Sequence, residues 1–235
     1  MTTPRALTFD VFGTCVDWRT TVIEEAEALG ARTGVEADWA AVADAWRGRY
    51  RPAMARVTSG ELPWLDFDEL HRLTLDEVLE ELGIGGLSEQ DRAALVPVWH
   101  HLRPWPDTRP GLERLAGRHT LATLSNGTEA MLGEIAERGR LPFDRILSAE
   151  HARAYKPDPS VYTMACEKLG LEPAEVTMVA AHGHDLEAAR GVGFGTAFVA
   201  RPLEWGPGGG ADRKPGSSFE IEAEDFEDLA TRLGA

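Results

Sequence analysis

The sequence predicts an α/β fold, a doubly wound parallel sheet forming a Rossmann-like core, with a helical cap inserted after the first strand. From residue 110 onward, short apolar runs alternate with helical segments, which is typical of a parallel sheet covered by helices on both faces. Residues 19–101 instead hold several helical periodicities and no convincing strand. The predicted domains are therefore a core of residues 1–16 and 103–235 and a cap of residues 17–102.

The elements follow in order along the chain. The first predicted strand covers residues 6–9, and Gly13 and Thr14 suit the turn after it. In the cap, Ser88 with Asp91 marks the start of the last helix. The proline-rich segment LRPWPDTRPG (102–111) is the expected linker back to the core. The remaining predicted strands cover residues 119–124, 146–147, 176–180 and 196–199.

Two further elements complete the predicted core. Pro159 suits a first helical position with Asp158 as its cap, and a final helix is predicted over residues 224–233. The segment EWGPGGGADRKPGSS (204–218) is glycine-rich, but it lacks the preceding strand, glycine spacing and Lys-Ser/Thr ending of a phosphate-binding loop. We expect a solvated surface loop there.

Composition excludes several classes of partner. The formal charge of −15 disfavours binding to nucleic acid or to an anionic membrane surface, whereas a small anionic substrate needs only a few local cations. No stretch is apolar enough to cross a membrane, and no secretory signal is visible. Cys15 and Cys166 lack metal-ligand spacing. A cytoplasmic enzyme is expected.

Polar side chains follow the predicted strands at the edge where a doubly wound sheet binds its ligands. Taken singly, each suits a local turn or a helix cap. Four separate segments that bring polar groups to one crevice favour a functional site. The candidates at this edge are Asp10, Ser125, Asn126, Lys156, His182 and Asp185.

Four ordered motifs connect these residues to a known family. They are FDVFGTCVDW, LSNGT, YKPDPSVY and VAAHGHDLEAAR. Together they resemble the motifs of the haloacid dehalogenase superfamily, and the helical insert falls between the first and second motifs, where that family places its smaller cap. The resemblance covers essentially the whole chain. It implies a reaction that begins with attack by Asp10.

Two departures from the phosphatases of that superfamily indicate the branch. Phosphatases resemble Asp-x-Asp at the first motif, and here the second acid is replaced by Phe12. Their last motif holds Mg²⁺ with a carboxylate pair, and here one of the pair is replaced by Ala181. A halide leaving group needs neither a proton nor a divalent cation. The chain is thus similar to the (S)-2-haloacid dehalogenases.

That resemblance implies hydrolysis of short 2-haloalkanoic acids to 2-hydroxy acids through an aspartyl ester, with no metal and no cofactor. Asp10 would be the nucleophile, and Thr14 would hydrogen-bond its carboxylate or stabilise the turn. Lys156 would hold the nucleophile's charge, and Asp185 would hold Lys156 and the hydrolytic water. Tyr162 follows Lys156 by six residues, as in the dehalogenases, and would bind the substrate or the halide, although an aromatic there also suits core packing.

Substrate and halide contacts are expected from both domains. In the core, Phe12 would face the substrate, Ser125 would bind its carboxylate, and Asn126 would face halide or carboxylate. In the cap, Arg47 follows a tryptophan as in the family's Trp-Arg pair and would receive the halide, with Arg51 as its rival. An aromatic from residue 64 or 67 would line the halide pocket.

His182 departs from the family pattern, which usually has Asn there and Ser at the position of Ala180. With an ordinary pKa of about 6.5, His182 would take a proton from the water that cleaves the ester, helped by Asp185. Donating a hydrogen bond is an equal alternative. The change also leaves open an atypical phosphatase or a non-catalytic relative. Homodimers are common in this family, and the sequence leaves the oligomeric state open.

Overall fold

The computed structural model describes residues 3–210 and 218–235. The chain divides into two compact units. The core unit comprises Met1–Asp17 and Arg103–Ala235, and the cap unit comprises Trp18–Leu102.

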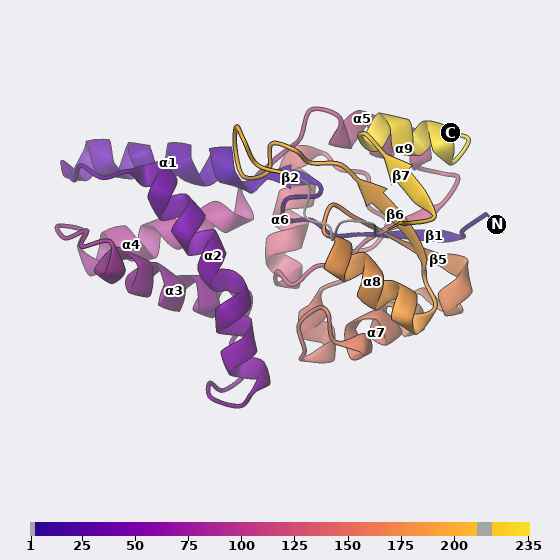
Figure 1. Ribbon diagram of the computed structural model, residues 1–235, viewed down its shortest axis with the longest axis horizontal. Coiled ribbons are helices and arrows are strands. Elements are labelled where there is room, and N and C mark those ends of the chain that lie inside the picture. The colour runs from indigo at the N-terminus through magenta and orange to yellow at the C-terminus, as the bar shows by residue number, and fades with distance from the viewer. Residues whose placement is uncertain (1–2, 211–217) are drawn as a thin grey trace. The chain divides into compact units, whose positions relative to one another are not determined.

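Within the described residues the core unit is built on a parallel sheet in the spatial order β4-β1-β5-β6-β7 (Figure 1). The chain leaves β1 for a neighbour on one side and later adds β5 on the other, so the order reverses between β1 and β5. Ligands of doubly wound sheets bind at such a reversal, beyond the carboxyl ends of the strands. The strands are β1 (Ala6–Phe9), β4 (Thr120–Thr123), β5 (Val176–Ala180), β6 (Gly195–Val199) and β7 (Ile221–Ala223).

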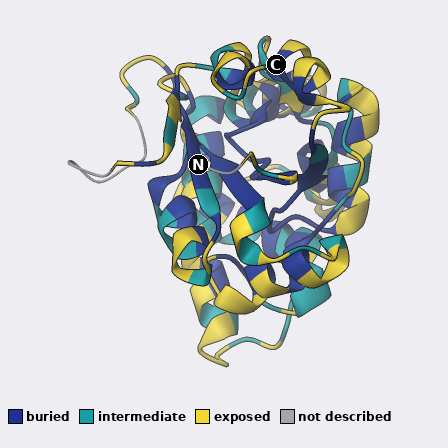
Figure 2. Ribbon diagram, turned by 90° about the vertical axis from the view of Figure 1, so that its right-hand side faces the viewer, coloured by how far each residue is buried: buried dark blue, intermediate teal, exposed yellow. Residues whose placement is uncertain are grey.

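Helices cover both faces of this sheet (Figure 1). On one face Phe9 stacks on Phe226 with ring centroids 5.8 Å apart. On the other, Tyr162 and Phe194 belong to one buried apolar cluster with alternate residues of the strands. Figure 2 shows the strands as buried and the outer helix faces as exposed. The helices of the core unit are α5 (Thr108–Leu115), α6 (Glu129–Gly139), α7 (Pro159–Leu169), α8 (Gly183–Val192) and α9 (Phe226–Arg232), with 3₁₀ turns at Ala149–Ala152 and Pro173–Glu175.

The α/β prediction is confirmed, and so are several local signals. Asp158 caps α7 by accepting a hydrogen bond from the Ser160 amide, and Pro159 is the first helical residue. The final helix begins two residues later than expected because Asp225 caps it.

The predicted strand at 146–147 is wrong. Only isolated bridges lie on either side of it, Ala122 with Arg145 and Ser125 with Ser148. The Thr123 hydroxyl donates to the Leu147 carbonyl and accepts from its amide, so a side chain takes the place of the backbone ladder. The expected linker is also partly regular: it pairs as β3 (Arg103–Pro104) with β2 (Val16–Asp17) and then enters α5.

The cap unit is helical throughout its regular structure. An aromatic cluster at its centre joins the helices: the Trp46 indole donates to the His71 carbonyl at 2.9 Å, and Trp99 stacks on the His71 ring. Ser88 caps the last α-helix through a reciprocal capping box with Asp91, as predicted. The helices are α1 (Trp18–Thr33), α2 (Trp39–Thr58), α3 (Phe67–Glu81) and α4 (Glu89–Leu95), followed by a 3₁₀ turn at Val96–His100.

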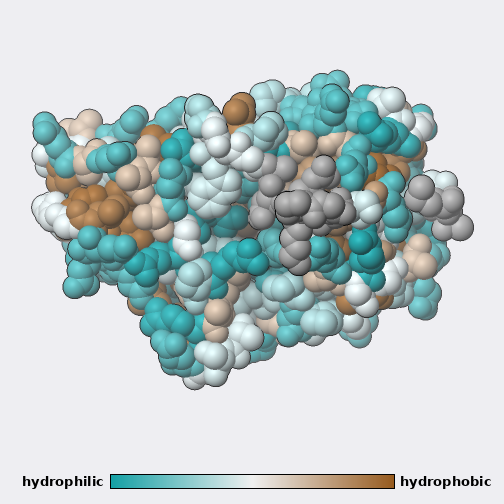
Figure 3. Space-filling view, in the orientation of Figure 1, coloured by the Kyte–Doolittle hydropathy of each residue, from teal (hydrophilic) through white to brown (hydrophobic). Residues whose placement is uncertain are grey.

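The visible surface is mostly hydrophilic (Figure 3). A brown patch marks the end of the cap unit where the loops after α1 and α3 emerge, and Leu82 is among the exposed large apolar residues. Over residues 3–210 and 218–235, every helix is too short or too polar to span a membrane.

Candidate active site

Polar side chains follow the carboxyl ends of β1, β4 and β5, where the strand order reverses. Asp10 comes directly after β1, and it lies 115 positions from Ser125 and 172 positions from His182, both of which it contacts. All three are buried. Parallel strands that end at one level deliver these side chains to one place.

Each oxygen of the Asp10 carboxylate accepts hydrogen bonds from two side chains. Oδ1 lies 3.0 Å from Lys156 Nζ and 3.4 Å from the Ser125 hydroxyl, and Oδ2 lies 2.8 Å from the Thr14 hydroxyl and 2.9 Å from His182 Nδ1. Burial alone raises the pKa of Asp10, but the charge of Lys156 and then the hydrogen bond and charge of His182 hold it far below its usual value. Asp10 is therefore an oriented and ionised carboxylate.

Lys156 bridges two carboxylates. Its Nζ binds Asp10 and the Oδ2 oxygen of Asp185, and its side chain is 6 % exposed. Burial lowers the pKa of Lys156, but the two carboxylates outweigh it and raise the pKa above the usual value. The backbone amide of Lys156 donates to Asn126 Oδ1 at 2.7 Å, so the second motif fixes the place of the third.

Tyr162 points at Asp185 from α7. Its hydroxyl donates to Asp185 Oδ1 at 2.6 Å, and the side chain is fully buried. Burial and the neighbouring charge of Asp185 raise the pKa of the phenol, so it stays a donor. The structure thus places Tyr162, expected at the substrate, behind Asp185.

His182 precedes the first turn of α8 and joins two carboxylates. Its Nδ1 faces Asp10, and its Nε2 lies 3.1 Å from each oxygen of Glu204. Burial lowers the pKa of the imidazole, but the charge of Glu204 and hydrogen bonds to Asp10 and Glu204 raise it to about 10. The expectation of an ordinary pKa near 6.5 is therefore wrong. At neutral pH His182 is an imidazolium that donates from both nitrogens.

Sequence reasoning missed Glu204. We expected a solvated surface loop at 204–218, and this prediction is wrong for Glu204, which is only 3 % exposed. Residues 211–217 of that segment lie outside the described residues. Arg201, just past β6, holds the turn: its Nε donates to the Thr14 carbonyl and its other nitrogens to both Asp107 oxygens, each at 2.8 Å. The available signal was an acid shortly after a strand, at the same edge as the other motifs.

Gly13 and Thr14 bring the nucleophile turn against these groups. Gly13 has φ +81°, and a Cβ there would overlap the Glu204 carboxylate, so the turn requires glycine. The Thr14 hydroxyl donates to Asp10 and accepts from the Ala181 amide at 2.9 Å. Thr14 therefore ties the first motif to the fourth as well as orienting the carboxylate.

Phe12 is buried against the second motif. A Cβ at Gly127 would lie 2.8 Å from Phe12 Cζ, so the phenyl ring rests on the glycine backbone. The position where a phosphatase of this superfamily has its general acid is thus filled by hydrocarbon.

Comparisons with known proteins identify the family of this chain. A family model described as haloacid dehalogenase-like hydrolase matches residues 4–193. The chain belongs to this family. It is 33 % identical to (S)-2-haloacid dehalogenase 1 of Pseudomonas sp. (strain CBS-3), over 84 % of this chain and 85 % of that one.

Solved dehalogenase structures have the same fold. The L-2-haloacid dehalogenase PA0810 is 44 % identical with a TM-score of 0.92, covering 98 % of this chain and 99 % of that chain. The L-2-haloacid dehalogenase from Xanthobacter autotrophicus with chloropropionic acid covalently bound is 26 % identical with a TM-score of 0.82, covering 99 % of both chains.

The donor set of this dehalogenase-like site does not fit a divalent cation. The carboxylates of Asp10, Asp185 and Glu204 each accept a hydrogen bond from Lys156 or His182, so a cation would meet two positive charges. In the described part of the chain, side chains close enough together to share a metal ion lie elsewhere, at Glu129, Glu150 and His151. These residues are exposed or half-buried, and His151 binds Glu129.

The cap residues expected at the halide are described within the cap unit. The Arg47 guanidinium lies over the Tyr50 ring at 4.3 Å and near the Trp18 ring at 5.7 Å. Its Nε is buried without a hydrogen-bond partner among the described residues, whereas Arg51 is exposed. Of the two candidate aromatics, Phe67 is buried in the cap core, and the residue at 64 is half-buried.

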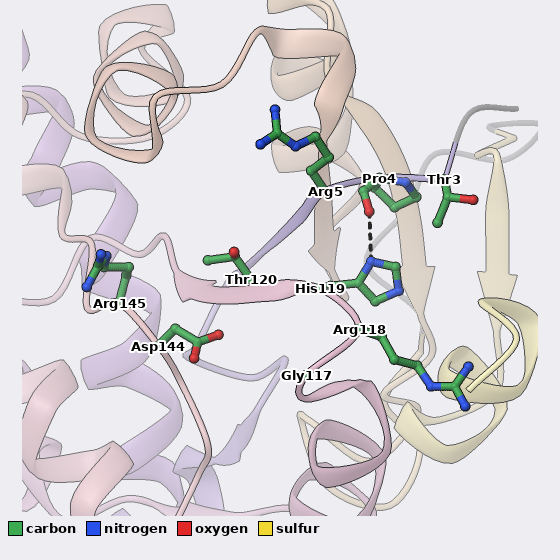
Figure 4. A pocket seen from close by; sticks show the side chains of 9 residues that line it. All are labelled: Thr3, Pro4, Arg5, Gly117, Arg118, His119, Thr120, Asp144 and Arg145. Atoms are coloured by element: carbon green, nitrogen blue, oxygen red, sulfur yellow. Dashed lines mark hydrogen bonds between the residues drawn. The ribbon is translucent and has the colours of Figure 1, made fainter.

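A groove of about 750 Å³ lies at the opposite, amino-terminal edge of the sheet (Figure 4). Its cationic side chains point in different directions, and several already have partners. Arg5 pairs with Glu175, Arg118 donates to the Gly234 carbonyl, and His119 contacts the Pro4 carbonyl. The buried polar cluster around Asp10 is therefore the better candidate site.

Proposed function

We propose that this hydrolase removes halogen from short (S)-2-haloalkanoic acids and forms 2-hydroxy acids with inversion, through an ester at Asp10 and without a metal. The state of Asp10 carries the proposal: it is buried, ionised and held by four donors, while Phe12 offers no acid for a leaving alcohol. The name of the Pseudomonas relative and the covalently bound chloropropionic acid of the Xanthobacter enzyme support the same chemistry.

We assign the first step to Oδ1, the oxygen with the longer hydrogen bonds. Lys156 and Ser125 lie 3.0 and 3.4 Å from Oδ1, whereas the two donors to Oδ2 lie at 2.8 and 2.9 Å. Oδ1 would attack C2 of the substrate. The carbon–halogen electron pair leaves with the halide, and an ester forms. Oδ2 then becomes the ester carbonyl oxygen, and the Thr14 hydroxyl donates to the charge that develops on it when water attacks.

The remaining roles follow the motifs. Ser125 and the amide of Asn126 would bind the substrate carboxylate. Arg47 would receive the halide, a role supported by the Trp-Arg pair of the sequence and by its unpartnered Nε. Lys156 and Asp185 hold the nucleophile, and His182 with Asp185 acts on the hydrolytic water.

Halide release from (S)-2-chloropropionate in excess chelator tests this function. Asp10→Asn should abolish halide release, and mass measurement should find the substrate carbon skeleton on the Asp10 peptide of the parent. Arg47→Ala should slow release, while the exposed neighbour Arg51→Ala serves as the matched control. Strict Mg²⁺ dependence with phosphate ester cleavage would support the phosphatase instead, and no turnover of either substrate the non-catalytic relative.

A further inference from the structure

Three buried side chains form a row beside the nucleophile: Glu204, His182 and Asp10. Their exposures are 3 %, 7 % and 6 %. The imidazolium donates Nε2–H to Glu204 and Nδ1–H to Asp10 Oδ2. One of its two anionic partners is thus the group that loses its charge in the first chemical step.

We propose that esterification of Asp10 releases the Nδ1 proton of His182, so that the nucleophile's own reaction converts a hydrogen-bond donor into the base for the second step. This inference rests on the proposed function. The hydrogen bond from Nδ1 to a carboxylate becomes one to an ester carbonyl, a weaker and uncharged acceptor. The hydrogen bond from Nε2 to Glu204 is unchanged, so the proton that leaves is the one on Nδ1.

The charges around His182 are consistent with this order. It faces Asp10 after β1, Glu204 after β6 and, on its own segment, the His184 ring at 5.8 Å, with Lys156 on the far oxygen of Asp10. Loss of the Asp10 charge leaves burial and Lys156 disfavouring the imidazolium, with Glu204 the remaining anion in contact. The pKa of His182, about 10 at rest, then falls.

The reaction balances with this proton. Halide leaves with the carbon–halogen electron pair, and His182 loses its Nδ1 proton to solvent. The free Nδ1 accepts a proton from water as the water oxygen bonds to Cγ of Asp10. Collapse breaks the bond between Cγ and the ester oxygen, and the departing alkoxide takes that proton back. Asp10 is left as the acid, and its proton passes to Nδ1, which restores the resting ion pair.

Glu204 is a positioning residue in this scheme. It fixes the neutral imidazole in the tautomer with hydrogen on Nε2, which aims the basic lone pair of Nδ1 at the ester. It also keeps the resting His182 charged. The buried turn that carries it is anchored by Arg201, whose carbonyl accepts the Glu204 amide at 3.1 Å.

The test is an equilibrium titration of the whole protein labelled with ¹⁵N-histidine, comparing the parent with Asp10→Asn and Asp10→Ala. Both variants remove the negative charge of Asp10, as esterification does. Asp10→Ala also lacks a side-chain amide, so it shows whether the orientation of the Asn amide affects the result. The pKa of His182 should fall from about 10 by about 1–3 pH units, and its neutral form should carry hydrogen on Nε2. A His182→Gln sample assigns the signal.

Glu204→Gln should lower the pKa of His182 in the otherwise native chain, and the exposed Glu137→Gln should leave it unchanged. A pKa that stays near 10 in both Asp10 variants, or a neutral form protonated on Nδ1, would overturn the inference. Halide release by the parent would be unaffected by that result, so the proposed function would stand. Absence of halide release, with the pKa shift present, would reject the function alone.

Discussion

Replacing His71 by phenylalanine should stabilise the cap unit and remove a loss of stability in mild acid. His71 is 3 % exposed in α3, stacked on Trp99 with ring centroids 4.1 Å apart and edge-on to Phe67. Neither ring nitrogen has a hydrogen-bond partner among the described residues. Because such a group costs about 1–3 kcal/mol, a carbon ring should recover about 1–2 kcal/mol if it packs without strain.

The acid effect follows from the pKa of His71, which burial and then the charge of Arg47 hold well below its usual value. Below about pH 6.5 the unfolded chain binds a proton at this residue, and the folded cap does not. The free energy of unfolding therefore falls with decreasing pH, by about 1.4 kcal/mol per pH unit. His71→Phe removes this term, so its stability advantage should widen by about 2 kcal/mol between pH 6.5 and 5.0.

Urea unfolding followed by tryptophan fluorescence measures this effect, because five of the seven tryptophans lie in the cap unit. The matched control is His119→Phe, a buried core histidine whose Nδ1 does contact a carbonyl, that of Pro4, at 2.8 Å. Packing of the phenyl ring changes the stability of His71→Phe equally at every pH, so it does not affect the difference between the two proteins in how the free energy of unfolding varies with pH. Parallel pH profiles for parent and His71→Phe would refute the reasoning.

Two further substitutions probe the buried polar network of the core unit. Arg201→Met should lower the core's free energy of unfolding by about 3 kcal/mol, because it leaves the mostly buried Asp107 without its ion-pair partner. The rate of amide hydrogen exchange in β1 and β5 should then rise about 10²-fold. Tyr162→Phe should cost about 1.5–3 kcal/mol, because it removes a 2.6 Å hydrogen bond to Asp185. A double-mutant cycle with Asp185→Asn checks the second, and additive effects would contradict it.

Much of the fold followed from local signals that tertiary structure did not override. Alternating apolar runs predicted the parallel sheet, and Asp158 and Ser88 marked helix starts that the structure confirms. The strand at 146–147 failed because a side chain, that of Thr123, supplies its partner hydrogen bonds. Such a substitution leaves no periodic trace in the sequence.

The site divides in the same way. Asp10, Lys156 and Asp185 were predictable because each ends or follows an element at one sheet edge, and the structure brings them together. Glu204 could not be predicted in this way, because its segment is rich in glycine and is typical of a surface loop. Its burial depends on the hydrogen bond from Arg201 to the Thr14 carbonyl, which joins distant parts of the chain. The charge of His182 could not be predicted without knowing that second carboxylate.

The balance of charge explains why a resting imidazolium helps the first step although it cannot act as a base. Three buried carboxylates with one lysine would leave two uncompensated negative charges, and burial would then push a proton onto one of them. His182 supplies the second cation, so Asp10 stays ionised without protonation. An asparagine in place of His182 would carry no charge to face Glu204 and Asp10. His182 and Glu204 therefore act together: the imidazolium compensates the buried charge of Asp10, and Glu204 keeps the imidazole protonated in the resting enzyme.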